Sequence, residues 1–272
     1  MAFSFSKIFK QISKATARGD TSYFGLDIGA ASAKMVQLRA SRGIAVLETY
    51  GEIALGPYGN QPIGKAVKLT PEKMAEALID LMREANVTSR TGGFSIPFSS
   101  SLVSVLDLPK VDEDSLKRIV PIEARKYIPV PISEVTLDWF VIPHEEGESS
   151  AFDQLQDKAP IRAKGQEVFL VAIHNDLLQQ YQTIASGAGL HVGFYEIEIF
   201  SALRSALGHG IAPILVVDFG AASTKMYIVE RGIVRLTHLL PVGGQQMTET
   251  LGRSLSWEFE KSRTRQARTR AH

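Results

Sequence analysis

Two short segments with almost the same sequence contain the residues best suited to bind an anion. Residues 27–35 read DIGAASAKM and residues 218–226 read DFGAASTKM, so seven of the nine positions are identical. Glycine and alanine let a backbone approach a phosphate closely, with its amide N–H groups pointing at the anion, and an aspartate can hold a hydrated cation nearby. The repeat therefore predicts two phosphate-binding turns that clamp one nucleotide from both sides.

Short apolar runs flank both segments. Residues 23–26 and 214–217 precede them, and residues 35–38 and 226–229 follow them. Strand, tight turn and strand are the elements of a β-hairpin, so we expect two equivalent hairpins to position the turns. The alternative is a pair of tight small-residue hairpins that bind no ligand.

The composition is that of an ordinary globular protein. The chain has 272 residues, 44% hydrophobic and 22% charged, with a net charge of +1 and no cysteine. The length predicts one large or two modest domains, and the charge gives no general attraction to nucleic acid. The lack of cysteine excludes disulfides, thiolate metal sites and cysteine nucleophiles. No apolar run is long enough to span a membrane and no signal peptide follows Met1, so we expect a cytoplasmic protein.

Helices and longer connections are expected between the two hairpins. Thr70, followed by Pro71, predicts the start of one helix, and residues 112–114 predict the start of another. Pro121 falls inside the second helical pattern and predicts a kink or a restart there. Residues 144–165 are polar and aperiodic, which is typical of a long connection between strands.

Both ends of the chain are basic. Apolar residues at helical spacing within residues 3–12 predict a short amphipathic helix, which either anchors the chain to a membrane or partner or docks on its own domain. Residues 257–272 are rich in arginine and lack apolar periodicity, so we expect a solvated basic tail. No aromatic residues alternate with these arginines, and we therefore expect no nucleic-acid binding.

Four further segments make the sequence resemble a known family. Residues 25–29 (GLDIG), 123–131 (EARKYIPVP), 134–138 (EVTLD) and 242–246 (VGGQQ) are similar to the PilM family, whose members act in type IV pilus assembly. This family belongs to the actin/Hsp70/hexokinase superfamily, and the resemblance covers about residues 23–256. It implies an α/β, actin-like (ribonuclease H-like) duplicated fold with an inserted α+β subdomain, as in FtsA and PilM.

The resemblance implies a site for ATP and Mg²⁺. Asp27 and Asp218 would position a hydrated magnesium ion, and Lys34 would reach the phosphates. Glu198, at the expected start of a connecting helix, matches a residue that orients the attacking water; alternatively it is a solvated carboxylate at a helix start. The residues implied to bind the nucleotide are Asp27, Gly29, Ser32 and Lys34 in the first loop and Asp218, Gly220, Ser223 and Thr224 in the second.

The resemblance also implies a domain organisation and a partner. The insertion would form a groove that binds the cytoplasmic N-terminal peptide of a PilN-like inner-membrane protein. We expect this groove to involve Phe94, Ile96, Val103 and Tyr127, each of which is alternatively a core residue. The expected parts are an amphipathic tail (1–20), a first subdomain (21–94, completed by about 194–212), the insertion (95–193), the start of a second half (213–256) and the basic tail (257–272).

Three functions are compatible with these features. The first is an ATP-binding scaffold of the pilus assembly complex, peripheral to the inner membrane through a PilN-like protein and other assembly proteins, and possible as a homo-oligomer. The second is an ATPase or small-molecule kinase of the same superfamily. The third is a membrane-tethered filament protein like FtsA. The family extends well beyond the helix expected at residues 248–255, so we expect an incomplete second half here.

Overall fold

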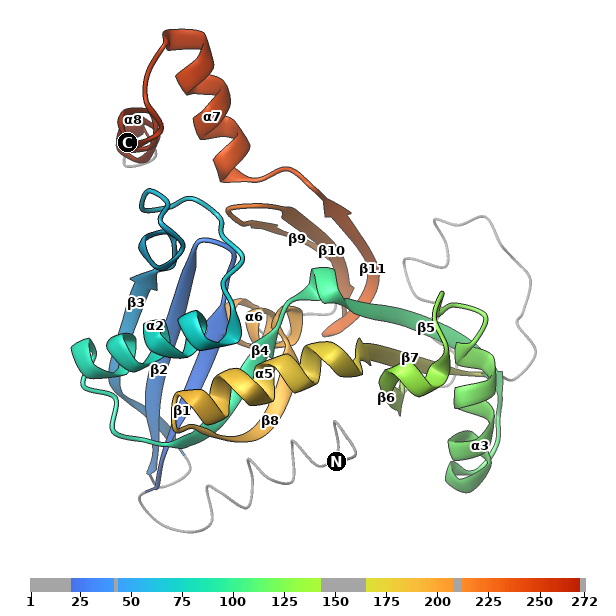
Figure 1. Cartoon of the computed structure of the whole chain (residues 1–272). Helices are drawn as coiled ribbons and strands as arrows, with labels where there is room; N and C mark the ends of the chain where they lie inside the picture. The colour runs from blue at the N-terminus through green and yellow to red at the C-terminus, as the bar shows by residue number, and fades with distance from the viewer. Residues whose placement is uncertain (1–20, 42–43, 143–164, 208–211, 270–272) are drawn as a thin grey trace.

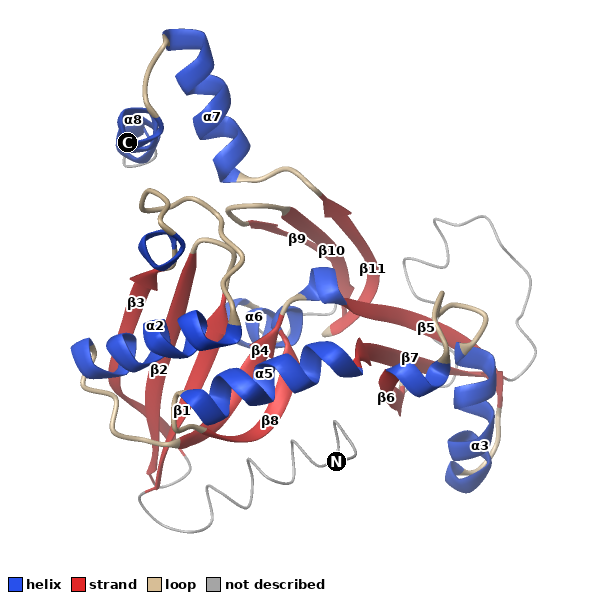
Figure 2. Cartoon of the chain, in the orientation of Figure 1, coloured by secondary structure: helices blue, strands red, loops and turns tan. Residues whose placement is uncertain are grey.

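The computed structural model describes residues 21–41, 44–142, 165–207 and 212–269. Their strands form three sheets with helices packed around them (Figures 1 and 2). The predicted N-terminal amphipathic helix and the connection at residues 144–164 lie outside the described residues. None of the helices in the described part is long and apolar enough to cross a membrane.

The largest sheet has five strands in the order β3-β2-β1-β4-β8. The first three are consecutive and antiparallel, whereas β4 runs parallel to β1 and β8 runs parallel to β4. This mixed order is the one expected for the first half of an actin-like fold. The strands are β1 (Thr21–Ile28), β2 (Ser32–Ser41), β3 (Ile44–Ala54), β4 (Thr91–Ile96) and β8 (His191–Ile197).

Helices α2 (Pro71–Glu84) and α5 (Asn175–Gly187) pack side by side over one face of this sheet (Figure 1). The start of α2 is the predicted one, because the Thr70 side chain accepts a hydrogen bond from Lys73 N and Pro71 occupies the first turn. The apolar face of α2 is buried against the sheet and α5. These contacts form the main hydrophobic core.

The inserted sheet has the order β5-β7-β6 and extends away from the first sheet (Figure 1). Helix α3 (Glu113–Ala124) packs on this sheet through a second hydrophobic core. It starts in the predicted range, with Asp112 as its N-cap, and it continues past Pro121 without a restart. The strands are β5 (Ser101–Pro109), β6 (Val135–Val141) and β7 (Gly165–His174).

The third sheet repeats the first three strands of the largest one. Its strands β9 (Ile214–Phe219), β10 (Thr224–Glu230) and β11 (Ile233–Leu240) form an antiparallel meander. Helix α6 (Glu198–Ala206) leads into it, and α7 (Gly244–Leu255) follows it. Most of the expected basic tail forms helix α8 (Phe259–Thr269).

Candidate functional site

The two repeated segments form the same tight turn. Gly29 N donates to Ser32 O at 2.9 Å, and Gly220 N donates to Ser223 O at 3.0 Å. A Cβ atom would lie 3.1 Å from Ser32 O at the first glycine and 2.9 Å from Ser223 O at the second. Both turns therefore favour glycine, because a side chain would press on the carbonyl oxygen that closes the turn.

The second loop is held by the start of α7. Gly244 N donates to Gly220 O and Gln245 N donates to Ala221 O, both at 2.9 Å. Gly243 allows this approach, since a Cβ atom there would lie 2.6 Å from both of these carbonyl oxygens. The GG pair of the VGGQQ segment therefore joins α7 to the loop, and the first amides of α7 are already used.

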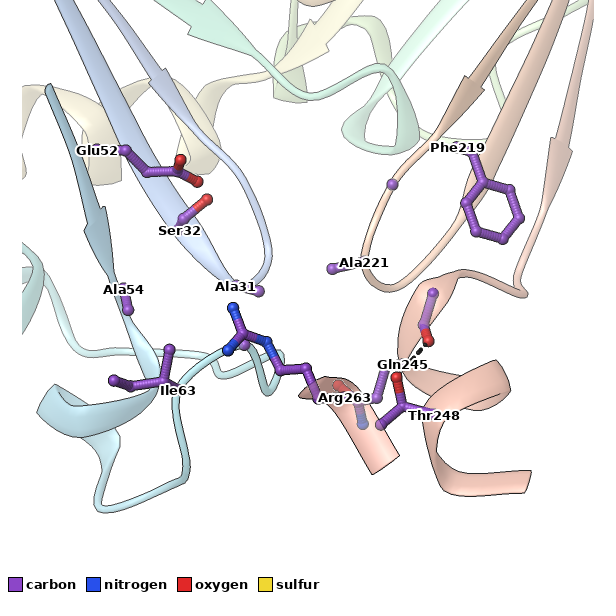
Figure 3. A pocket seen from close by; sticks show the side chains of 13 residues that line it. Ala31, Ser32, Glu52, Ala54, Ile63, Phe219, Ala221, Gln245, Thr248 and Arg263 are labelled. Atoms are coloured by element: carbon purple, nitrogen blue, oxygen red, sulfur yellow. Dashed lines mark hydrogen bonds between the residues drawn. The ribbon is translucent and has the colours of Figure 1, made fainter. Parts of the chain in front are cut away.

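A cleft of about 590 Å³ separates the two loops (Figure 3). Ala31 and Ser32 line it on one side, and Gly220 and Ala221 line it on the other. Arg263 of α8 points into this cleft. The cleft is thus lined by loops of both sheets and by the two C-terminal helices.

Two side chains from these helices reach the segment that follows β3. The Gln245 side-chain oxygen accepts a hydrogen bond of 2.7 Å from Ala66 N. The Arg263 side chain lies against Gly64, which has φ +85°, and a Cβ atom there would be 2.2 Å from Arg263 Nε. The loop at residues 60–69 is therefore shaped to accept both helices, and it connects the two halves beside the cleft.

Each hairpin places an aspartate directly opposite a lysine. Asp27 pairs with Lys34 across β1 and β2, and Asp218 pairs with Lys225 across β9 and β10. The surroundings of the two lysines differ. Lys34 is exposed, whereas the side chain of Lys225 is only 12% exposed.

Lys225 joins two carboxylates. Its Nζ lies 2.7 Å from Glu198 Oε1 and 3.0 Å from Asp218 Oδ2. Burial would lower the pKa of Lys225, but hydrogen bonds and charge attraction from Glu198 and Asp218 outweigh it, so the pKa is raised. Lys225 is therefore an ammonium ion at neutral pH. The adjacent Tyr227 has its pKa raised to about 12, first by burial and then by the charge of Asp218.

Glu198 is the first residue of α6, as expected, and its carboxylate is bonded rather than solvated. Its Oε1 accepts a hydrogen bond of 2.7 Å from Phe98 N in addition to the contact with Lys225. The side chain is 18% exposed. The same oxygen thus connects the turn that follows β4, the start of α6 and strand β10.

The predicted nucleotide-binding residues do not all line the cleft. Ser32 and Gly220 do, but Asp27 and Lys34 line a separate hollow of about 630 Å³ on the open face of the largest sheet. Thr224 is buried, and its hydroxyl donates to Val242 O at 2.7 Å. Its hydroxyl proton is therefore used in holding the chain before α7.

A divalent cation fits poorly between the carboxylates of the second hairpin. Asp218 and Glu198 already share the ammonium of Lys225. The described ranges contain no cluster of three or more His, Cys, Asp or Glu side chains that could hold a metal ion. A magnesium ion beside these two carboxylates would have to displace Lys225 or tolerate its positive charge.

The residues expected to bind a partner peptide lie in different environments. Phe94 and Ile96 are 1% and 0% exposed, and Phe94 packs edge-on against Phe24, Tyr181 and Tyr195. Both are core residues, which was the alternative for each of them. Val103 is partly buried against the main core, and Tyr127 is 48% exposed. Of the four, Tyr127 is the one with a substantially exposed side chain.

Three residues of the site were not identified as such from the sequence. Lys225 could have been found because it matches Lys34 in the repeat. Gln245 lies in the VGGQQ segment, but nothing in that segment indicates its bond to Ala66. Arg263 was assigned to a solvated tail because its position in the cleft depends on how α8 packs.

Comparisons with known proteins agree with this architecture. A family model described as "Type IV pilus assembly protein PilM" matches residues 25–270. A solved structure described as "PilM-PilN type IV pilus biogenesis complex" is 22% identical, with a TM-score of 0.69 over 88% of this chain and 67% of that chain. The cytoplasmic domain of EpsL, an inner-membrane component of the type II secretion system of Vibrio cholerae, is 10% identical, with a TM-score of 0.49 over 85% of this chain and 75% of that chain. The ethanolamine utilization protein EutJ from Carboxydothermus hydrogenoformans is 14% identical, with a TM-score of 0.47 over 95% of this chain and 69% of that chain.

Proposed function

Because this chain belongs to the PilM family of type IV pilus assembly proteins, we propose that it is a nucleotide-binding adaptor of the pilus assembly complex. Its nucleotide is ATP, bound between the two hairpin loops, and its partner is the cytoplasmic N-terminal peptide of a PilN-like inner-membrane protein. Attachment to that protein would hold it at the membrane surface.

The two equivalent turns on either side of one cleft are the observation that carries the nucleotide proposal. Each turn is closed by the same Gly-to-Ser backbone bond, and Ser32 and Gly220 both line the cleft. Turns of this kind present backbone amides to an anion. The guanidinium of Arg263 adds a positive charge within the same cleft. A polyphosphate matches this combination of small loops and a cation.

A steric substitution tests this assignment. Ala221 lines the cleft, whereas the adjacent Ala222 is exposed and does not. Ala221→Phe should weaken ATP binding at least about tenfold in calorimetric titration, because the ring fills space needed by the phosphates, while the matched control Ala222→Phe stays within about threefold of wild type. Equal losses in both variants, or no ATP binding by the wild type, would contradict the proposal.

Binding and switching fit the site better than rapid hydrolysis. A water-orienting carboxylate needs a free oxygen directed at the attacking water. Glu198 is not among the residues that line the cleft between the loops, and its Oε1 is bonded to Phe98 N and Lys225 Nζ. We therefore propose that ATP acts mainly as a structural ligand, so that single-turnover measurements would show slow hydrolysis relative to binding.

The inserted sheet offers a place for an extended peptide. Strands β5 and β6 are its two edges, and an edge strand can accept a further strand through backbone hydrogen bonds. Ile122 and Tyr127, in and just after α3, are 60% and 48% exposed. They could hold apolar side chains of a peptide bound beside this sheet.

Fluorescence anisotropy with a labelled N-terminal peptide of the cognate PilN-like protein tests the partner. Tyr127→Ala should weaken binding about tenfold, the loss typical of an exposed aromatic anchor. Ile79→Ala is the control, because Ile79 is 45% exposed on α2, in the first subdomain. A peptide that binds both variants as it binds wild type would remove Tyr127 from the interface.

A further inference from the structure

Lys225 lies between the two carboxylates that the family resemblance assigns to a hydrated cation and to an attacking water, and one of them, Asp218, is two residues before Gly220 of the cleft. Its ammonium is held between Asp218, the carboxylate of the second loop, and Glu198, the carboxylate of the connecting helix, at 3.0 and 2.7 Å. Both are residues for which a cation or an activated water was expected. The positive charge at this point is therefore supplied by the chain itself.

The position of the ammonium is well determined by its neighbours. Glu198 Oε1 is fixed by Phe98 N, in the turn that follows β4, and Asp218 is directly opposite Lys225 in the β9–β10 ladder. Within the described residues, three separate elements thus define one site for a single positive charge. The equivalent lysine of the first hairpin, Lys34, is exposed instead.

This arrangement conflicts with a magnesium ion at the same place. Magnesium in nucleotide sites keeps several waters and is bound through one or two carboxylates together with the phosphates. Here an ammonium already occupies the space between the two carboxylates and reduces their combined charge to about −1, and it would repel a dication placed beside it. The donor set suits a resident monovalent cation better than a hydrated divalent one.

We propose that Lys225 replaces the divalent cation of this site, so that ATP binds between the loops without magnesium. The inference rests on the proposed nucleotide site. In this arrangement the ammonium offsets the negative charge of Glu198 and Asp218 that would otherwise repel the phosphates. Lys225 is thereby the residue that determines the metal requirement of the site.

Titration of the full chain with ATP, in excess EDTA and in excess Mg²⁺, tests the inference directly. The wild-type dissociation constant should agree within about threefold between the two conditions. ATP binding that occurs only with Mg²⁺ would overturn the inference while leaving the nucleotide site in place. ATP binding in neither condition would overturn the proposed function and the inference with it.

Substitution of Lys225 sharpens the test. Lys225→Met leaves Glu198 and Asp218 without their shared cation, so ATP binding in EDTA should weaken at least about tenfold, and Mg²⁺ should restore it. Lys34→Met changes the equivalent position of the first hairpin, and its ATP affinity should not rise when Mg²⁺ replaces EDTA. Lys225→Arg keeps the positive charge and should bind ATP equally well in EDTA and in Mg²⁺, as wild type does. A Lys225→Met protein that binds ATP in EDTA as wild type does would overturn the inference. The wild-type comparison needs no variant and remains decisive if Lys225→Met does not fold.

Discussion

The first and second hairpins have nearly the same sequence but different roles in the structure. Both close with the same Gly-to-Ser bond, and both place an aspartate opposite a lysine. In the first hairpin Lys34 is exposed, whereas in the second Lys225 is bonded to Glu198 and Asp218. The difference arises because α6 presents a carboxylate to β10. The same local sequence therefore gives a solvated lysine in one half and a fixed internal cation in the other.

The anchoring of the two loops differs as well. Carbonyl oxygens of the first loop accept bonds from Leu55 N and Val67 N, in the chain that follows β3. Carbonyl oxygens of the second loop accept bonds from the first amides of α7. The second loop is thus coupled directly to α7, whereas the first loop is held by the chain that follows β3.

The largest expected effect concerns the packing of α7 on the second loop, for which the first loop has no equivalent. Gly243→Val should lower the free energy of unfolding by about 3 kcal/mol, because its side chain would collide with the carbonyls of Gly220 and Ala221. Gly244→Ala is the control, since its Cβ would lie 3.8 Å from the nearest atoms. Urea unfolding of both variants measures the difference, and equal stabilities would show that close packing of α7 on the loop is unimportant.

The next prediction compares the two lysines directly. Lys225→Met should reduce the free energy of unfolding by about 1 to 2 kcal/mol, because it leaves the partly buried Glu198 without its counter-ion, whereas Asp218 is 41% exposed and can be solvated. Lys34→Met should change it by less than about 0.5 kcal/mol, since Lys34 is exposed. Denaturant unfolding at neutral pH checks both values. Similar losses in the two variants would mean that the pairing of Lys225 contributes nothing specific.

The difference in unfolding free energy between wild type and Lys225→Met should depend on pH. The folded-state pKa of Lys225 is raised above the ordinary value of 10.5. Its contribution to stability is therefore complete below that pH and is lost as the pH rises through the folded-state pKa. The stability difference between wild type and Lys225→Met should shrink by about 0.5 to 0.8 kcal/mol from about pH 8 to about pH 11. A difference that stays constant over this range would contradict the pairing.

The smallest expected effect concerns the contact between the halves. Gln245→Ala removes the acceptor of Ala66 N and should cost about 1 kcal/mol of unfolding free energy. Gln179→Ala, on the exposed face of α5, should leave the stability nearly unchanged. Hydrogen exchange at Ala66 gives a local readout, because its amide should lose protection in Gln245→Ala alone. Unchanged protection would exclude this bond in solution.

Much of the fold could be predicted from the sequence. The two hairpins, the helix starts at Thr70 and at residues 112–114, and the helix starting at Glu198 are all confirmed. Each depends on hydrogen bonds or apolar spacing within a few residues of the chain. The actin-like class and the PilM family followed from motifs in the same segments, and the comparisons confirm both.

Two segments depended on contacts that the sequence does not show. Residues 259–269 lack apolar periodicity, yet they form a helix in which Ser262 is fully buried. Pro121 was expected to kink or restart the second helix, and α3 continues past it without a restart. Tertiary contacts outweigh local propensity in such segments.

The sequence by itself determined the two tight turns and their Asp–Lys pairs, because short-range backbone bonds and strand register require no distant partner. Tertiary structure alone decided which lysine became a buried cation, which loop α7 holds and that Arg263 enters the cleft. Each of these depends on an atom from an element far along the chain, such as Glu198 for Lys225. Local sequence patterns do not indicate such distant neighbours, so the chemistry of the cleft depends on how the halves pack together.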